Sequence, residues 1–543
     1  MSLAGILDIS RTALFASQSA LSVTSNNIAN VNTPGYSRQD VVLNIANPAS
    51  STFGSVGRGV TVAGIRRNYD RFLQAQLLGQ GQSQGRSATL DSAWGQIESV
   101  FNENMGIGLS SAMTNYLNAW QDVQANPTSL TPRTVLLKKA DSLITSTKGI
   151  EKSILNTLNS TNEAIITDVS KVNVITNDVA KLNEQISQQE AGTNLPSAND
   201  LRDQRDQKLN ELAQLVDFST YEDNNGAVTV TVNMRNLVSG GNVNTLSTVM
   251  NSDGNRDLVL DNVNITAGVQ KGEIGGLIAA RTDIQSMALT SLRTLVGSIT
   301  QQVNQLHQAG FGLDGSTGND FFAPLQLTTS QNSFGASITA AAITSQTALT
   351  LDEYTVTFDT VGGTYSVLNK QTGATVIPAT GYNAAGTAIA LPGISVTIAG
   401  PVTNTDTFTI SPIATAIKNF GVAITDPRKV AASSNLAELP GNSDIALQIS
   451  QLSDLSQASL DGSTFSDFYA GIVATVGVMK RTAADSVTFD NSLMEALQSR
   501  RESISGVSLD EEAANLIRYQ RSFEASARMV NVADELMKTV LSL

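Results

Sequence analysis

The stretch Asn26-Asn27-Ile28-Ala29-Asn30-Val31-Asn32-Thr33-Pro34-Gly35-Tyr36-Ser37-Arg38-Gln39, close to the N-terminus, decides how the rest of the chain is arranged. Pro34 disfavours helical geometry at Thr33, and Pro-Gly suits the second and third positions of a type II turn, so we expect a helix to end near Asn32. Four asparagines occupy its final turns, although asparagine is a poor helix former. Because amides both donate and accept hydrogen bonds, we predict that this row serves contacts between subunits. A plain helix stop followed by a turn is the alternative.

Upstream of this stretch, from Leu3 to Val31, apolar side chains recur every seven residues, a pattern typical of a coiled-coil helix. A helix of about 30 residues with one narrow apolar seam is too thinly apolar to be stable alone in water. It therefore needs a partner helix. The residues that we predict to lie in an assembly interface at this end of the chain are Leu7, Leu14, Leu21, Asn26, Asn27, Ile28, Asn30, Asn32, Pro34, Gly35 and Tyr36.

The last helix has the same heptad character. Ser508-Leu509-Asp510-Glu511 forms a capping box, and apolar residues then repeat at intervals of seven, with Ala513, Gln520, Ala527 and Asp534 at the positions between them. We predict that the two ends of the chain pair as a coiled coil, and that both stay frayed in the free subunit until neighbours in a polymer order them. The interface residues that we predict at this end are Leu509, Leu516, Tyr519, Gln520, Phe523, Val530 and Met537.

The middle of the chain is mainly helical, and we predict a multidomain α+β protein. Helical periodicity appears at 69–78, 90–123, 131–189, 274–308 and 443–501, with Thr131 as N-cap and Pro132 at the first helical position of the longest helix. A helix of that length indicates an elongated bundle. The predicted parts are an axial helix and turn at 1–40, an elongated helical domain at 41–325 with a small β part at about 218–269, its continuation at 416–505, and an axial coiled-coil helix at 506–543.

Residues 326–415 differ in composition from the rest, because Thr, Ala, Gly and Val dominate and charges are few. The pattern predicts short strands at 354–358, 364–368, 394–398 and 407–410, separated by glycine turns. We predict an inserted all-β domain, a sandwich or a barrel.

Composition excludes several classes of function. The net charge of −14 argues against binding nucleic acid or an anionic membrane through bulk electrostatics, and no apolar run is long enough to cross a bilayer. The chain has no cysteine, which excludes thiol catalysis and Cys-ligated metals. Its one histidine, His307, is best explained as the last-turn residue of a helix, where it meets the helix dipole. We predict no catalytic residue, cofactor or metal ion.

Longer runs of the sequence resemble one family. Residues 26–39 are similar to the N-terminal signature of the axial proteins of the bacterial flagellum, which are the rod, hook and hook-associated proteins. The C-terminal run 506–520, continued to Arg528, resembles the hook-associated members found at the junction of hook and filament, and the internal runs 125–128 and 272–277 agree with them. The resemblance covers both termini and much of the helical middle, but not the β insertion.

This resemblance implies a non-enzymatic structural protein that is exported through the flagellar type III apparatus and assembles outside the cell as a ring between hook and filament. The first residues, Met1 to Asp8, lack a basic region and a long apolar run, so we expect no Sec-type signal peptide. The implied partners are further copies of the chain, the hook protein, a second hook-associated junction protein or flagellin, and an export chaperone, with neither nucleic acid nor membrane.

Three alternatives stay open at the level of sequence. The chain could be another axial protein, such as the hook or distal rod protein. It could carry a hydrolytic activity, for which Asp352 and Glu353 are a conceivable acid and base, although neighbours on a strand point to opposite faces. Finally, the Thr-rich β insertion could be adhesive.

Overall fold

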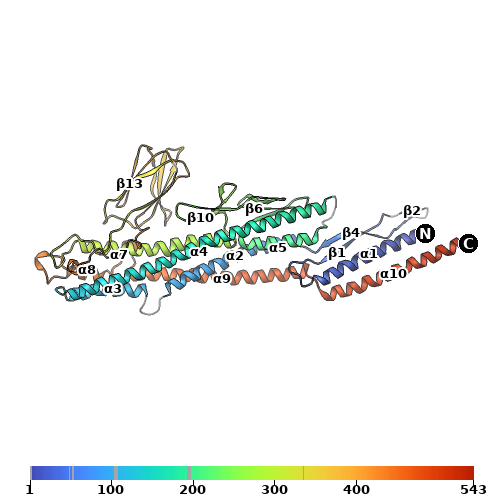
Figure 1. Cartoon of the computed structure of the whole chain (residues 1–543), viewed down its shortest axis with the longest axis horizontal. Coiled ribbons are helices and arrows are strands. Elements are labelled where there is room, and N and C mark those ends of the chain that lie inside the picture. The colour runs from blue at the N-terminus through green and yellow to red at the C-terminus, as the bar shows by residue number, and fades with distance from the viewer. Residues whose placement is uncertain are drawn as a thin grey trace.

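The protein is a long rod, as the computed structural model shows (Figure 1). It describes residues 3–47, 49–51, 54–102, 108–191, 197–333 and 335–542. Both termini lie at one end of the rod, a helical bundle fills the remainder, and a β domain projects from one side of the bundle (Figure 1). The predicted multidomain α+β class, with paired terminal helices, an elongated bundle and an all-β insertion, is confirmed.

The narrow end of the rod, which we call the terminal arm, consists of the two terminal helices and a β ribbon. α1 (Leu3–Ala29) and α10 (Leu509–Ser542) lie side by side (Figure 1). The ribbon pairs β1 (Gln39–Ile45) with β4 (Val60–Arg67) and continues through β2 (Ala49–Ser51) and β3 (Gly54–Val56). The ribbon packs on α1, so residues 41–67 lie against the arm and not within the helical domain to which we had assigned them.

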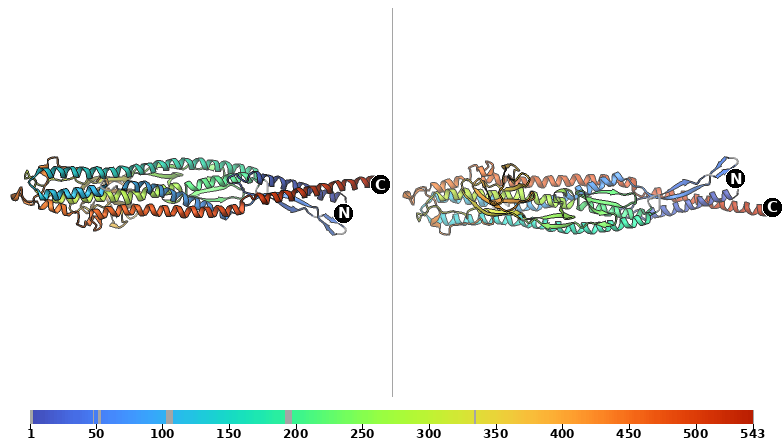
Figure 2. Two further views of the ribbon diagram at one scale, coloured as in Figure 1. Left: turned by 90° about the horizontal axis from the view of Figure 1, so that it is seen from below. Right: turned by 90° about the horizontal axis from the view of Figure 1, so that it is seen from above.

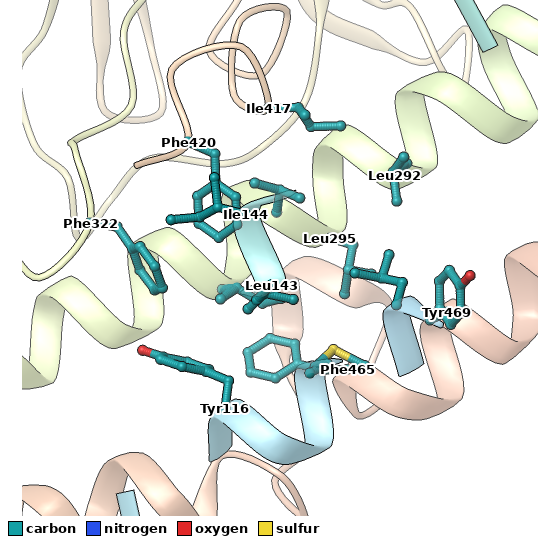
Figure 3. Packing of buried hydrophobic residues seen from close by; sticks show 14 of the residues in the cluster. Tyr116, Leu143, Ile144, Leu292, Leu295, Phe322, Ile417, Phe420, Phe465 and Tyr469 are labelled. Carbon is teal, nitrogen blue, oxygen red and sulfur yellow. The ribbon is translucent and has the colours of Figure 1, made fainter. Parts of the chain in front are cut away.

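The bundle contains all the other long helices. Its core joins buried side chains of α3, α4, α7 and α9 around Tyr116, Leu143 and Phe465, and Figure 3 shows how they interlock. Trp94 and Trp120 are also fully buried. The helices are α2 (Arg71–Phe101), α3 (Leu109–Ala125), α4 (Leu130–Glu190), α5 (Asn199–Leu215), α6 (Gly272–Asp283), the π-helix η2 (Ile284–Thr290), α7 (Ser291–Gln308), α8 (Asp444–Gln451) and α9 (Phe465–Ser505), and the short 3-10 segments are η1 (Thr266–Gly268), η3 (Pro427–Lys429), η4 (Leu436–Glu438) and η5 (Ala458–Leu460).

Three helix boundaries differ from the sequence predictions. α2 runs unbroken through the Gly- and Gln-rich residues 79–89, where we predicted no helix, because glycines let it approach its neighbours closely: a Cβ on Gly85 would lie 2.1 Å from the carbonyl oxygen of Gln214. The predicted helix 90–123 is divided between α2 and α3, and residues 103–107 lie outside the described residues. The N-cap of α4 is Ser129, not Thr131, because the Ser129 side chain accepts the Thr131 N–H.

The β part between α5 and α6 lies along α4 (Figure 1). Its inward side chains, such as Val230, Leu237 and Leu258, are fully buried against the helices and form a second core with Val172 and Val179 of α4. The strands are β5 (Ser219–Glu222), β6 (Val228–Val232), β7 (Arg235–Ser239) and β8 (Asn242–Val243) in one antiparallel sheet, and β9 (Ser247–Met250), β10 (Arg256–Leu260) and β11 (Val263–Asn264) in another.

The inserted domain is a sandwich of two antiparallel sheets with its own core around Val356, Val396 and Phe408. The four strands that we predicted are present within one or two residues of their ends, and four more complete the sheets. One sheet has the order β12 (Thr328–Asn332), β19 (Thr407–Ser411), β14 (Tyr354–Asp359), β15 (Thr364–Asn369), β16 (Thr375–Gly381), and the other the order β13 (Ser337–Ile343), β18 (Ile394–Ala399), β17 (Thr387–Leu391). Among the described helices of the whole chain, none combines the length and hydropathy of a membrane span.

Candidate assembly interface

The turn after α1 has the geometry that its sequence predicts. α1 ends at Ala29, three residues before the predicted position. Gly35 has φ +86°, which suits the third position of a type II turn, and the Tyr36 N–H donates to the Thr33 carbonyl at 3.2 Å. Pro34, at the second position, is exposed. The chain therefore reverses direction here and enters the ribbon at Gln39.

Asn27 is the only one of the four asparagines in this stretch that is buried, with 1% of its surface exposed. Its amide donates to the Gln39 carbonyl at 3.0 Å and to Glu512 Oε2 at 3.2 Å, and its oxygen accepts from the Gln39 N–H at 3.0 Å and the Tyr36 hydroxyl at 2.8 Å. These partners all belong to the same chain. Within the subunit, the return of β1 beside α1 uses all of the hydrogen-bonding capacity of this amide, and the expected contact of Asn27 with a neighbouring subunit stays a prediction.

The other three asparagines lie at the surface. Asn26 and Asn32 are exposed and Asn30 is half-buried. Asn30 bonds locally, with its Nδ2 donating to the Asn26 carbonyl at 3.0 Å and its Oδ1 accepting from Thr33 at 3.0 Å. Within the subunit Asn26 and Asn30 therefore bond to each other at the end of α1.

Arg38 connects the turn after α1 to the last helix, α10. Its Nε lies 2.7 Å from Glu512 Oε1 and its Nη1 lies 2.8 Å from Glu511 Oε2. Burial alone would lower the pKa of Arg38, but Glu512 and Asp40 outweigh it and raise the pKa above its usual value. Glu512 is 1% exposed, so this charged pair is largely removed from water. The Arg38 N–H also donates to the Ser505 carbonyl at 2.8 Å, at the end of α9.

Asp203 on α5 holds the same turn from the side of the bundle. Its two carboxylate oxygens accept the Ser37 N–H at 2.9 Å and the Ser37 hydroxyl at 2.8 Å. Arg67 Nη1 bridges Asp203 and Asp206 at 2.7 Å each. Burial raises the pKa of Asp203 even though Arg67 opposes that shift, and burial with the nearby Asp200 and Asp203 raises the pKa of Tyr36.

These contacts form one polar cluster where the arm joins the bundle, and we call it the corner cluster. It comprises Asn27, Tyr36, Ser37, Arg38, Gln39, Arg67, Asp203, Arg501 and Glu512. It connects α1, the ribbon, α5, α9 and α10. A small polar cavity of about 140 Å³ beside it is large enough for ordered water. The sequence predictions included only Asn27 and Tyr36 from this cluster.

Beyond the corner cluster, α1 and α10 pair in an antiparallel manner. Asn27 meets Glu512 near the bundle, and the Ser17 hydroxyl donates to the Ser522 hydroxyl at 3.1 Å further out. The most buried row of α1 is small or polar and alternates at spacings of four and three: Ala16, Ala20, Val23 and Asn27. The predicted seam lies beside that row and is half-buried: Leu7, Leu14, Leu21 and Ile28.

On α10 the predicted apolar row is correct in part, but its companion row is displaced by one residue. The protected positions between the apolar ones are Glu512, Tyr519, Ser526 and Ala533. Of the positions that we predicted, Ala513, Gln520 and Asp534 are exposed and Ala527 is half-buried. Sequence periodicity identified the helix, but small and polar side chains on both rows concealed which side meets α1.

Much of the apolar surface of α10 stays uncovered within the subunit. Leu516, Tyr519 and Val530 are half-buried, whereas Leu509 is 53% and Phe523 37% exposed. Among the described side chains of α10, the large exposed apolar ones are Leu509, Ile517, Phe523, Met529, Val532, Leu536, Met537 and Val540.

The ribbon presents a second apolar surface that the sequence analysis missed. Leu43 is 47% and Ile45 84% exposed, and the register pairs Leu43 with the exposed Val62. Alternation along a strand places Leu43 and Ile45 on one face. The alternating Val41, Leu43 and Ile45 were the signal that could have identified this surface.

Comparison with known proteins shows what the chain is similar to. The model described as flagellar hook-associated protein FlgK helical domain matches residues 94–322. Models of the flagella basal body rod protein and of the flagellar basal body rod FlgEFG protein C-terminal match residues 7–36 and 498–543. Flagellar hook-associated protein 1 of Escherichia coli is 29% identical over 556 residues, covering 100% of both chains. The chain is similar to flagellar hook-associated protein 1 over its full length.

Two further relatives agree with this assignment. Flagellar hook-associated protein 1 of Bacillus subtilis is 26% identical over 573 residues and covers 99% of this chain and 97% of the relative. The solved structure titled flagellar hook junction protein FlgK from Burkholderia pseudomallei superposes with a TM-score of 0.69 at 18% identity, covering 79% of this chain and 100% of that one. This structural similarity shows that the fold is shared.

Proposed function

We propose that this chain is a structural component of the bacterial flagellum that joins hook to filament by self-assembly through its paired terminal helices. The observation that carries the proposal is the terminal arm, in which α1 and α10 pair but leave apolar side chains such as Leu536 and Val540 exposed. Exposed apolar surface of this extent is typical of a protein–protein interface. Full-length similarity to hook-associated protein 1 supports the same function.

The assembly interface in this proposal comprises the outer faces of the arm. On α10 it includes the exposed Leu509, Phe523 and Met537, and on the ribbon Leu43 and Ile45. The exposed asparagines Asn26 and Asn32 belong to it, whereas Asn27 stabilises the subunit. The half-buried Leu7, Leu14 and Leu21 of α1 contribute both to packing within the subunit and to the assembly interface.

The proposed partners follow from this location. Other copies of the chain flank it in the flagellar axis, the hook protein lies on one side, and a second hook-associated protein or flagellin lies on the other. An export chaperone receives the exposed helices before assembly, and the assembled protein is extracellular. We also propose that the arm (1–67 and 506–543), the helical domain and the sandwich (326–415) act as separate parts, with the sandwich facing outward.

Electron microscopy of a deletion strain tests the junction role. Cells that lack this chain should carry hooks of normal length without filaments, and a plasmid copy should restore the filaments. Absence of the hook itself would contradict the junction role and favour the hook or distal rod alternative. Of the matched models, those named for rod proteins cover only the two ends of the chain, whereas the hook-associated model covers the helical middle.

A hydrolytic role for Asp352 and Glu353 has less support. Both residues precede β14, so our description of them as neighbours on a strand is wrong. The Glu353 backbone is bonded to the turn that follows β15, since its carbonyl accepts the Lys370 N–H at 2.8 Å and its N–H donates to Gln371 at 3.1 Å. Activity of the purified chain on cell-wall substrate that is lost on changing both acids to amides would reverse this conclusion.

An adhesive role for the sandwich also has less support. Among its described residues the large exposed apolar side chains are Val361 and Val376, and its aromatic residues are buried or half-buried. Sugar-binding surfaces generally use aromatic rings with an exposed face. Replacing the sandwich by a short Gly-Ser linker should leave the filament attached if the domain faces outward, whereas loss of the filament would place it within the joint.

A further inference from the structure

Two helices of the bundle lie along its opposite long sides, which we call its edges. Both views in Figure 2 show α4 along one edge and α9 along the opposite edge. The two helices run in the same direction, from the end that holds α3 and α8 toward the terminal arm (Figure 1). Copies placed side by side without inversion would therefore bring the α4 edge of one copy next to the α9 edge of another.

The α4 edge is basic in its first part and apolar further along. Lys139, Lys148 and Lys152 have no ion-pair partner among the described residues. Lys148, Lys152 and Leu155 follow at spacings of four and three, so they share one side of the helix. Leu155 is 37% exposed, and Val174, nearer the arm, is 63% exposed.

The acidic segment that leads into α9 and the first turn of α9 have the opposite charge, and we count this segment as part of the α9 edge. Between Lys429 and Lys480 the sequence contains five acidic residues and no lysine or arginine. Asp454, Asp461 and Asp467 are exposed, and no cation within the described parts of the chain pairs with them. Closer to the arm, Val478 is 62% and Phe489 67% exposed.

Asp461 and Asp467 also border a cleft of about 1630 Å³ between the bundle and the sandwich. The basic residues of that cleft already have partners: Arg293 lies 2.8 Å from Glu151, and Lys370 lies 4.0 Å from Asp253. The cations of the cleft therefore do not pair with Asp461 or Asp467, and Asp454 lies outside the lining of the cleft.

We propose that the α4 edge of one copy docks against the α9 edge of the next copy, with the lysines facing the aspartates and Leu155 and Val174 facing Val478 and Phe489. This inference rests on the proposed self-assembly. The occupant is a second copy because the complementary surfaces belong to one chain, lie on opposite edges and follow in the same order. A contact between two different surfaces of identical copies is heterologous, and it closes into a ring when the rotation permits. Complementary charge sets the register and the neighbour.

Cysteine cross-linking in the flagellum tests the contact directly, because the chain has no cysteine of its own. Cells that express only the double variant Lys152→Cys with Asp454→Cys are treated with a flexible bis-maleimide, and hook–filament preparations are analysed on denaturing gels. We expect a ladder of covalent oligomers from the double variant and none beyond dimers from either single variant. Presence of the chain in the preparation without a ladder overturns this inference alone, whereas absence of the chain overturns the proposed function as well.

Charge reversal provides the second measurement. Lys148→Glu with Lys152→Glu should weaken the contact about tenfold, as expected when several exposed ion pairs become repulsive, and should lower the fraction of hooks that bear filaments. Adding Asp454→Lys and Asp461→Asn to the same copy should restore that fraction. The matched control is Lys418→Glu with Lys429→Glu, which changes the charge equally at exposed positions that are on neither α4 nor α9. Equal effects of the test and control pairs, or no recovery, would overturn the inference.

Discussion

Replacing Asn27 by alanine tests whether the corner cluster stabilises the subunit. The change removes a side chain that is 1% exposed and satisfies the N–H and the carbonyl of Gln39 as well as Glu512. A buried polar group left without its partner costs about 1–3 kcal/mol, and water can reach part of the site, so we expect the corner to lose about 3 kcal/mol. Asn30→Ala is the matched control: its half-buried amide bonds only within its own turn, and we expect a loss below about 1 kcal/mol.

The assay is native-state hydrogen exchange on the full-length subunit, read at the amides of β1 and the last two turns of α1. A loss of 3 kcal/mol corresponds to an exchange rate about 150-fold faster where local opening limits exchange. The Asn27 variant should exchange faster at the corner while the bundle core keeps its protection. Protection of β1 within about 0.5 kcal/mol of the wild type would refute the reasoning and return Asn27 to a role between subunits.

Three further predictions follow from the same structure. Arg38→Ala leaves the buried Glu512 without its cation and should destabilise the corner cluster by about 3 kcal/mol. Arg38→Lys keeps the charge but loses the guanidinium group that reaches Glu511 and Glu512 together, so it should cost less. Hydrogen exchange at the first turns of α10 distinguishes the two variants. Gly85→Ala should destabilise the subunit by about 1–3 kcal/mol in denaturant unfolding, because the new Cβ meets the Gln214 carbonyl. Gly79→Ala has open space around the new Cβ and should stabilise α2 by up to about 1 kcal/mol. Equal effects of the two substitutions would contradict the close packing at Gly85. His307 is fully buried, accepts the Ala431 N–H at Nε2, and has its pKa lowered to about 4 by burial. Its contribution to the free energy of unfolding, about 3 kcal/mol in total, is therefore complete above pH 6.5, declines as pH falls, and is lost below pH 4. The NMR signal of its imidazole, the only one in the chain, should titrate near pH 4, and titration near 6.5 would contradict this.

The sequence predicted the elements of this fold better than their contacts. Spacing of apolar residues located α4, α10 and the strands of the sandwich, because each has one side that must be buried. It failed at residues 79–89, where glycine has low helix propensity but permits the close approach of α2 to Gln214. The interruption between α8 and α9 was also absent from the prediction, since both flanking segments carry helical patterns.

For the candidate interface, the sequence predicted which segments take part but not which of their residues are buried within the subunit and which are exposed. Asn27 and Asn30 are identical side chains three residues apart, and only the path of β1 decides that one is buried and the other is not. The corner cluster joins residues from five elements, and periodicity within one helix contains no information about Asp203 or Arg67. For His307 the sequence predicted a last-turn residue, but its burial makes it neutral and bonded on both ring nitrogens, so interaction of its charge with the helix dipole is not its role.

The antiparallel pairing of α1 with α10 also sets an order of events. Asn27 and Glu512 are 485 positions apart, and Ser17 and Ser522 are 505 apart. Any process that delivers the chain from its N-terminus produces α1 first and the helix that covers it last. Contacts between such distant residues form slowly, because nearly the whole chain must be present before they close. The terminal arm therefore forms only in the complete chain. A chain that lacks α10 can fold its bundle, but Asn27 and Arg38 lack their partners on α10 and the arm cannot bind a neighbour.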